Sequence, residues 1–309
     1  MKSIKKKNVS RKKLVAQKKV LFLFKIFIII VVLLGIYALR FSPQLFQVKL
    51  KSEAVVSQNI HVSVTPAPPP PVEKNTPTPI PKPTIPPGFC LSVPVIFYHH
   101  VEPIAQATTA GHAQLTVDST KFETHMQYLN DRGYTSITAE ELVAAVTNHT
   151  SLPGKPIVVS IDDGYSDIYN YAFPIIKKYN IKTSLFISTG LLGNSGYMTW
   201  ENLREMVGSG LVSIYNHTWS HYSLGRGDSS KIAYEIDTAQ SQFEEYLGRK
   251  PTIFAYPYGI TSQAAVDVLK KSGFAGAFTT AGSWYQCDSR LYLLPRIRIG
   301  NAPLSYFGL

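Results

Sequence analysis

The chain has 309 residues and a formal charge of +11, with 31 lysines and arginines against 20 aspartates and glutamates. An apolar content of 45% and a charged content of 17% exclude a wholly disordered or collagen-like chain. Residues 1–51 hold 13 of the basic residues and no acidic one, so the rest of the chain is close to neutral. The charge is thus a property of the N-terminal tail, and no nucleic-acid partner is expected.

A basic tail at 1–19 precedes an apolar segment at 20–39. Twenty helical residues span about 30 Å, the thickness of the hydrocarbon core. The nine basic residues before the segment predict a cytoplasmic N-terminus. Lys25 is the one charge inside, near the cytoplasmic end, where a lysine can reach the interface. A cleaved signal peptide is the alternative, but no small-residue cleavage site follows. We therefore expect a single-pass anchor in the cell membrane, with the rest of the chain extracellular.

The segment 40–87 has a different composition. Residues 65–87 contain 11 prolines in 23 positions, which favours polyproline II and prevents a packed core. We interpret this segment as an extracytoplasmic linker that holds a domain at 88–309 away from the membrane. The alternative is that this segment binds an SH3-type domain, but such domains are cytosolic and the segment is expected to be extracellular.

From residue 88 onward, short apolar runs alternate with stretches of helical periodicity. Strands are expected at 93–98, 157–161, 183–187, 212–214, 253–255, 275–278 and 294–299. Helices are expected at 119–131, 138–146, 172–179, 199–207, 231–247 and 262–271. Repeated strand–helix units predict a parallel sheet, and about seven of them favour an α/β barrel over an open sheet.

The only two cysteines, Cys90 and Cys287, lie near the two ends of this domain. An even number in an extracytoplasmic domain makes a disulfide plausible. A buried pair of free thiols is the alternative, and two cysteines do not decide between them.

Three predicted strands run into ionisable residues. Asp162 and Asp163 follow one strand, His217 and His221 follow another, and His99 with His100 follows the first. In a parallel barrel, chemistry is placed at these carboxyl ends. The spacing of His217 and His221 would let both project from one helical turn toward a single metal ion.

Each motif also has a structural explanation. Asp-Asp-Gly is common in turns, a lone His-x-x-x-His is more often incidental, and adjacent histidines can form a hydrogen-bonded pair. Their joint placement after separate strands of one barrel favours the functional interpretation.

Three motifs together resemble the NodB-like polysaccharide deacetylases, carbohydrate esterase family 4. They are Ser-Ile-Asp-Asp-Gly-Tyr at 160–165, His-Thr-Trp-Ser-His at 217–221 and Phe-Ala-Tyr-Pro-Tyr-Gly at 254–259. The resemblance covers 89–309 and implies a distorted (β/α) barrel that removes acetyl groups from N-acetylated sugars. It also implies one divalent metal ion, with zinc favoured and cobalt, nickel or iron as alternatives.

Site residues follow from the same resemblance. Asp163, His217 and His221 correspond to the metal ligands, Asp162 to the general base, and the backbone N–H of Tyr258 to an oxyanion donor. Such roles suit the chemistry, because an amide carbonyl needs an activated water and stabilisation of the developing oxyanion.

Two features depart from the common pattern of the family. No histidine follows His221, whereas Phe-Tyr-His-His-Val at 97–101 resembles the branch of poly-β-1,6-N-acetylglucosamine deacetylases of biofilm formation. In that branch the acid histidine comes first, which points to His99, with His100 as the alternative. Ala255 stands where classical members have an arginine, and Arg296 is a candidate to support the base instead.

Exposed aromatic rings can stack on sugars, and Tyr165, Trp219 and Trp284 are candidates. For the two tryptophans a place in the core is at least as well founded. We expect a metal-dependent N-deacetylase of an N-acetylglucosamine polymer, with poly-β-1,6-N-acetylglucosamine favoured and peptidoglycan second. An O-acetyl esterase or other amide metallohydrolase on this fold is an alternative, as is a non-catalytic carbohydrate-binding surface protein.

Overall fold

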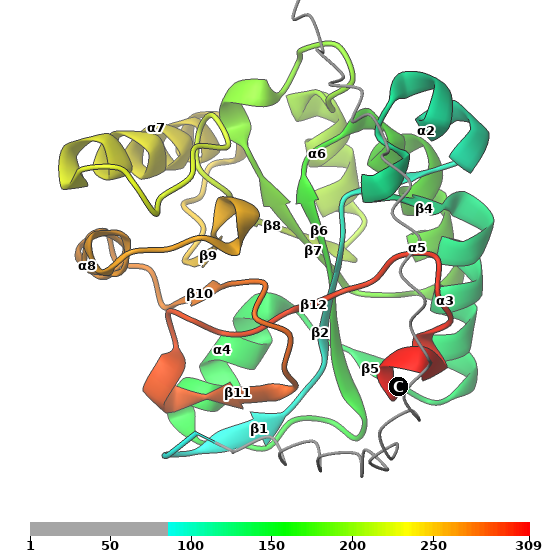
Figure 1. Ribbon diagram of the computed structural model, residues 1–309, viewed down its shortest axis with the longest axis horizontal. Coiled ribbons are helices and arrows are strands. Elements are labelled where there is room, and N and C mark those ends of the chain that lie inside the picture. Colours follow the sequence, from blue (N-terminus) through cyan, green and yellow to red (C-terminus); the bar gives the residue numbers. More distant parts are fainter. Residues whose placement is uncertain (1–85) are drawn as a thin grey trace, which may run out of the picture. The chain divides into compact units, whose positions relative to one another are not determined.

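The computed structural model describes residues 86–309. Its central sheet has eight parallel strands: β5 (Thr135–Ser136) pairs with the start of β6, and the other seven follow the order β10-β9-β8-β7-β6-β2-β12 (Figure 1). These seven strands are β2 (Val95–Tyr98), β6 (Pro156–Asp163), β7 (Thr183–Ile187), β8 (Val212–Asn216), β9 (Ile253–Ala255), β10 (Gly276–Phe278) and β12 (Ile297–Arg298). Just before β12, Leu294 forms a parallel bridge to Phe278 of β10, which links the two ends of the strand order. The prediction of an α/β fold with about seven parallel strands is confirmed.

Helices surround these strands (Figure 1). They are α2 (Ile104–Ala110), α3 (Ser119–Asp131), α4 (Ala139–Asn148), α5 (Phe173–Tyr179), α6 (Trp200–Gly208), α7 (Ser229–Leu247) and α8 (Gln263–Lys271). All except α2 lie where helical periodicity predicted them. The predicted capping box at the start of α4 is present, with Thr138 accepting from the Glu141 N–H and Glu141 accepting from the Thr138 N–H.

The central strand β6 is buried on both faces, which explains its uninterrupted apolar run. Ile157, Val159 and Ile161 pack into one hydrophobic cluster, and Val158 packs into a second cluster on the opposite face. Because a parallel strand covered on both sides has no solvent face, its charged side chains appear only where it ends, at Asp162 and Asp163, and the one polar side chain before them, Ser160, donates to the Ile96 carbonyl.

Short strand pairs were not predicted from the sequence. Strand β1 (Cys90–Ser92) pairs antiparallel with β11 (Tyr285–Cys287), and β3 (His100–Glu102) pairs with β4 (Thr116–Asp118). The first expected strand, 93–98, is observed as β2, which begins two residues later at Val95. Cys90 and Cys287 are direct partners across the β1–β11 pair, and their Sγ atoms form a disulfide.

Within residues 86–309, no helix has both the length and the apolar character that a membrane span requires. The predicted tail at 1–19, the anchor at 20–39 and nearly all of the linker at 40–87 lie outside the described residues. These three assignments therefore stay predictions.

The buried His125 on α3 makes the stability of this domain depend on pH. Its Nε2 lies 3.0 Å from the Ala302 carbonyl oxygen, and its Nδ1 lies 3.1 Å from the Tyr98 hydroxyl. Because a carbonyl can only accept, Nε2 carries the proton and Nδ1 accepts from Tyr98. Burial lowers the pKa of His125 to about 4, so the imidazole is neutral in the folded protein.

We expect the free energy of unfolding to fall as the pH drops from about 6.5 to about 4, because the unfolded histidine takes up a proton first. His125 contributes roughly 3 kcal/mol to this fall. Denaturant unfolding at a series of pH values should show a shallower dependence for His125→Gln, which keeps a donor but does not titrate. Equal pH dependences in the two proteins would contradict the assignment.

Candidate active site

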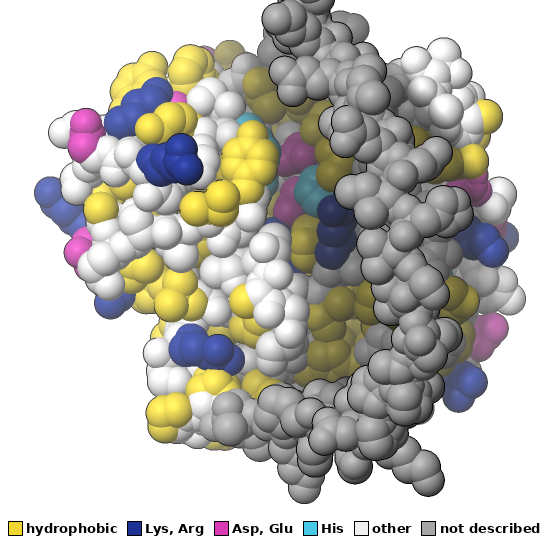
Figure 2. Space-filling model, in the orientation of Figure 1, with side chains coloured by type: hydrophobic (Ala, Val, Ile, Leu, Met, Phe, Trp, Pro, Cys, Tyr) yellow, Lys and Arg dark blue, Asp and Glu magenta, His cyan; other side chains and the backbone are white. Residues whose placement is uncertain are grey.

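The carboxyl ends of the strands surround a cavity of about 580 Å³, which we call the Asp162 cavity. Figure 2 shows acidic, histidine and basic side chains at the bottom of a hollow in this face. The ionisable residues lining it are His99, Asp162, Asp163, His217, His221, Arg296 and Arg298, together with three tyrosines. The sheet thus brings together residues that are far apart in the sequence, as expected for a parallel barrel.

One carboxylate and two imidazoles converge in this cavity. The Nε2 atoms of His217 and His221 lie 3.4 Å and 3.2 Å from Oδ1 of Asp163. That Oδ1 is buried and has no partner of hydrogen-bond geometry among the described residues. Two nitrogens and one oxygen that converge without hydrogen-bonding one another form a donor set suited to a divalent metal ion with open positions.

The hydrogen bonds behind the two imidazoles fix which nitrogen faces Asp163. Nδ1 of His217 donates to the Ala255 carbonyl oxygen at 2.7 Å, so the unprotonated Nε2 points into the cavity. Nδ1 of His221 lies 3.1 Å from the Tyr258 hydroxyl. Partners of this kind orient metal-ligating histidines in proteins generally.

The loop that carries the two histidines differs from the prediction. Residues 217–221 form no helical turn, because Thr218 and His221 have φ values of 69° and 59°. Asn216 accepts from the Thr218 N–H, and the fully buried carboxylate of Glu235 on α7 accepts from the N–H and hydroxyl of Ser220. The histidines therefore converge through a braced irregular loop and not through helical spacing.

Backbone strain is concentrated at the cavity. Besides Thr218 and His221, Asp163 and Tyr258 have φ values of 75° and 62°. Residues other than glycine rarely adopt a positive φ, because the β-carbon then meets the backbone. Where they do, surrounding contacts hold them in place, and such residues cluster at functional sites. At Tyr258 the backbone N–H makes no hydrogen bond within residues 86–309 and is free to donate to a ligand.

Asp162 and Arg296 form a buried bidentate ion pair. Nη1 and Nη2 of Arg296 lie 2.7 Å and 2.8 Å from the two carboxylate oxygens, and Arg296 also donates to the Thr279 carbonyl. Burial raises the pKa of the Asp162 carboxyl, but the charge of Arg296 and its hydrogen bonds outweigh burial, so the pKa lies below its usual value. The structure thus brings Arg296 to the residue that it was expected to support.

The two adjacent histidines of the 97–101 motif, His99 and His100, line different cavities. His99 lines the Asp162 cavity, whereas His100 lines a neighbouring cavity, where its Nδ1 lies 2.7 Å from Asp167. Burial lowers the pKa of His99, while the carboxylates of Asp162 and Asp163 act in the opposite direction. Of the two candidates for the acid, only His99 is in contact with the cavity that holds Asp162.

The aromatic candidates are divided in the same way. Tyr165 lines the Asp162 cavity, but neither Trp219 nor Trp284 does. Trp219 packs against the hydrophobic core and meets Tyr234 edge to face, with 5.8 Å between the ring centroids. Trp284 precedes β11, and its carbonyl accepts from the Val93 N–H. The structure therefore does not bring the two tryptophans to the site.

Sequence reasoning missed Arg298, which also lines the Asp162 cavity and donates to the Gln114 carbonyl. The sequence does contain a signal for Arg298: residues two apart on a strand point to the same side, and Arg298 lies two residues after the candidate Arg296. Glu102 and Asp167 were also missed, since no motif marks them.

Comparisons with known proteins agree with this geometry. Residues 149–277 match the family model described as polysaccharide deacetylase. The putative polysaccharide deacetylase YxkH of Bacillus subtilis is 28% identical over 207 residues, which cover 67% of this chain and 71% of the relative. The poly-β-1,6-N-acetyl-D-glucosamine N-deacetylase of Staphylococcus epidermidis is 27% identical over 202 residues, which cover 60% and 68% of the two chains.

A solved structure gives the same result. The Streptococcus pyogenes deacetylase PplD, in complex with acetate, superimposes with a TM-score of 0.64 and 26% identity, over 68% of this chain and 93% of that one. Residues 149–277 therefore form a polysaccharide deacetylase domain, and these similarities indicate that the protein is a polysaccharide N-deacetylase.

Arg296 is expected to act as a positioning residue for Asp162. Replacing it by methionine should lower kcat for acetate release by about 10- to 100-fold, as loss of such supporting contacts does elsewhere. KM and bound metal should change little, and Arg296→Lys should recover part of kcat because it restores a positive charge. Steady-state kinetics with metal analysis would measure this, with the half-exposed Arg204→Met as control. Normal turnover of Arg296→Met would remove this residue from the mechanism.

Proposed function

We propose that this protein is a metal-dependent N-deacetylase of a polysaccharide that contains N-acetylglucosamine. The observation that carries the proposal is the convergence of Asp163, His217 and His221 beside Asp162 and His99 in one solvent-accessible cavity. Asp163, His217 and His221 would hold one divalent ion, with zinc favoured and cobalt, nickel or iron as alternatives. When bound, such an ion polarises a carbonyl and acidifies water.

The remaining groups of the cavity would move protons and stabilise charge. Asp162, kept ionised by Arg296, accepts a proton as a water oxygen bonds to the acetyl carbonyl carbon. The backbone N–H of Tyr258 donates to the developing oxyanion. Protonated His99 then donates to the amide nitrogen as the C–N bond breaks. Burial lowers the pKa of His99, which makes its protonated form a stronger acid.

We propose poly-β-1,6-N-acetylglucosamine as the polymer, with peptidoglycan second. Two observations support this choice. The first is the similarity to the S. epidermidis enzyme named for that polymer. The second is the position of His99, which precedes the family match at 149–277 and matches the Phe-Tyr-His-His-Val motif of that branch.

We also propose that the domain acts outside the cell, attached to the membrane by residues 20–39. The support is the asymmetric charge of the tail, the proline-rich segment after it and the disulfide between Cys90 and Cys287, a bond typical of oxidising compartments.

Acetate release from defined N-acetylglucosamine oligomers tests the proposal. We expect release from β-1,6 oligomers that stops with a chelator and returns with a divalent ion. Activity on β-1,4 oligomers alone would overturn the choice of polymer. Full activity after chelation would overturn metal dependence, and release from O-acetylated polymers alone would identify an esterase.

A further inference from the structure

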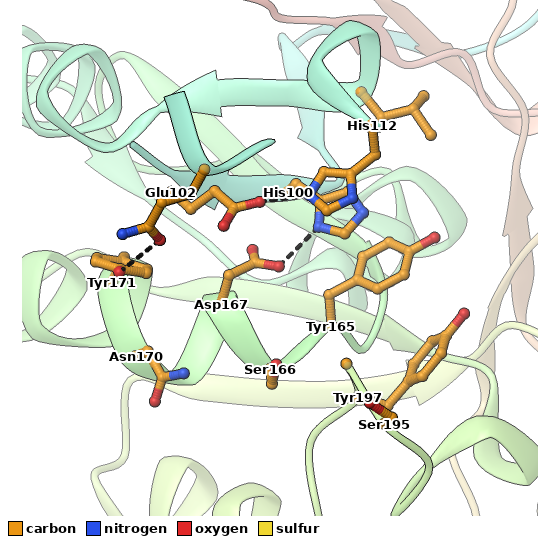
Figure 3. A pocket seen from close by; sticks show the side chains of 13 residues that line it. His100, Glu102, His112, Tyr165, Ser166, Asp167, Asn170, Tyr171, Ser195 and Tyr197 are labelled. Atoms are coloured by element: carbon orange, nitrogen blue, oxygen red, sulfur yellow. Dashed lines mark hydrogen bonds and ion pairs between the residues drawn. The ribbon is translucent and has the colours of Figure 1, made fainter. Parts of the chain in front are cut away.

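A second cavity of about 520 Å³ adjoins the Asp162 cavity, and we call it the His112 cavity. Tyr165 and Leu115 line both cavities, so the two are neighbours across one tyrosine ring. The mechanism above uses none of the residues found only in the His112 cavity. Figure 3 shows it from close by, with side chains from β3, the segment after α2 and the chain around η3 (Ile168–Ala172).

Three rings form a stack on one side of the His112 cavity. The ring centroids of Tyr165 and His100 are 3.6 Å apart, and those of His100 and His112 are 4.0 Å apart (Figure 3). Each imidazole is held by a carboxylate, His100 by Asp167 and His112 by Glu102. Asp167 also accepts from the Val101 N–H at 2.7 Å, so the stack is fixed to the backbone of β3.

A metal ion is the first ligand to consider, because His100, Glu102 and His112 could each offer one donor atom. An imidazole binds a metal in its own ring plane, through the nitrogen lone pair. Here the two rings are parallel, with an interplanar angle of 7°, so their planes do not meet at a common ion. The stacked arrangement therefore favours an organic ligand.

The lining of the His112 cavity has the composition of a sugar site. Tyr165, Tyr171 and Tyr197 provide aromatic surface, and amides and hydroxyls such as those of Asn170 and Ser195 provide hydrogen bonds. Tyr171 is held by Gln106, to which its hydroxyl donates at 3.0 Å. A polymeric substrate that reacts in the Asp162 cavity must place a neighbouring sugar unit close by.

The charges of the two cavities differ. The Asp162 cavity contains Arg296 and Arg298, whereas the His112 cavity is lined by Glu102 and Asp167 and by no lysine or arginine. Both oxygens of Asp167 are used by His100 and Val101. On Glu102, by contrast, Oε1 meets His112, and no hydrogen bond within residues 86–309 engages Oε2. One carboxylate oxygen is therefore available to a cation.

We propose that the His112 cavity binds the sugar unit next to the reacting one, in the form whose amino group is free and protonated. This inference rests on the proposed function, because such a unit is what the reaction itself leaves on the polymer. The ammonium group would donate to Glu102, and an N-acetylated unit has no charge to offer there. The enzyme would therefore act preferentially beside units that are already deacetylated.

The test compares two oligomers of equal length and linkage, one fully acetylated and one partly deacetylated. For the wild type we expect kcat/KM to be about fivefold higher on the partly deacetylated oligomer, the size of effect that one partly buried charge pair gives. Glu102→Gln should abolish this preference, and Asn170→Asp, which adds a carboxylate to the same cavity, should increase it. The matched control is Glu201→Gln on α6, whose side chain is 84% exposed and should not alter it.

Binding of a fully deacetylated trimer, measured by calorimetry, gives a second readout that needs no turnover. We expect its Kd to rise about fivefold in Glu102→Gln. In the wild type the Kd should also rise as salt is added, because salt screens the charge pair. No preference in the wild type, or a preference that survives in Glu102→Gln, would overturn the inference. If no oligomer releases acetate, the proposed function fails, and an unchanged trimer Kd in Glu102→Gln would separately overturn the assignment of the cavity.

Discussion

Replacing Asp162 by asparagine is expected to lower kcat for acetate release by a factor between about 10² and 10⁴, the range that general acid–base catalysis supplies. The amide keeps the size of the side chain but cannot take a proton from water. It also leaves Arg296 buried without its carboxylate partner, so we expect the free energy of unfolding to fall as well. The activity must therefore be expressed per folded, metal-loaded enzyme.

The measurement is a comparison of kcat at saturating substrate, with metal content and circular dichroism recorded on the same samples. Asp131→Asn at the exposed end of α3 is a matched control that should behave like the wild type. If Asp162→Asn kept more than about a tenth of the wild-type kcat, Asp162 would not be the base.

Replacing His217 by alanine is expected to have an effect of similar size for a different reason. His217 is 1% exposed and directs its unprotonated Nε2 at Asp163, so its loss removes one of three converging donors. Bound metal should fall from one per chain to well below one. Activity should fall by about a thousandfold, which corresponds to the several kcal/mol that a metal ion supplies to such reactions.

Metal analysis after dialysis against a chelator, followed by addition of a divalent ion, checks this expectation. The wild type should recover its activity and the variant should not. His149→Ala changes a half-exposed histidine that lies outside the cavity, and should bind metal like the wild type. A wild-type metal content in His217→Ala would contradict the assignment of the metal ligands.

Much of the fold could be predicted because the longer elements carry clear local patterns of apolar and capping residues. The buried strand β6, the capping box before α4 and the helix α7 all have strong local signals. The positions of the site residues followed from topology, because parallel strands end at one edge and polar side chains after those strands must meet there.

What could not be predicted depends on contacts without a local signal. Strands β1, β3, β4 and β11 have three residues each, too few to show alternation. Residues 217–221 were expected to form a helical turn, since spacing alone does not reveal the left-handed backbone that contacts with α7 stabilise. The His112 cavity joins residues from three segments, and only the folded chain brings His100, His112 and Asp167 together.

The disulfide between Cys90 and Cys287 has a mechanical consequence. If the domain is attached through its N-terminal side to a fixed support, any pulling force enters the described residues just before Cys90. At Cys90 that force is shared between the backbone that leads to β2 and the disulfide that leads to Cys287 on β11. Strand β2 lies between β6 and β12 and is followed at once by His99, so a force that peeled β2 away would disrupt the cavity first. The covalent link therefore keeps β1 joined to β11, and so to the C-terminal part of the domain, when a force acts on its N-terminal side.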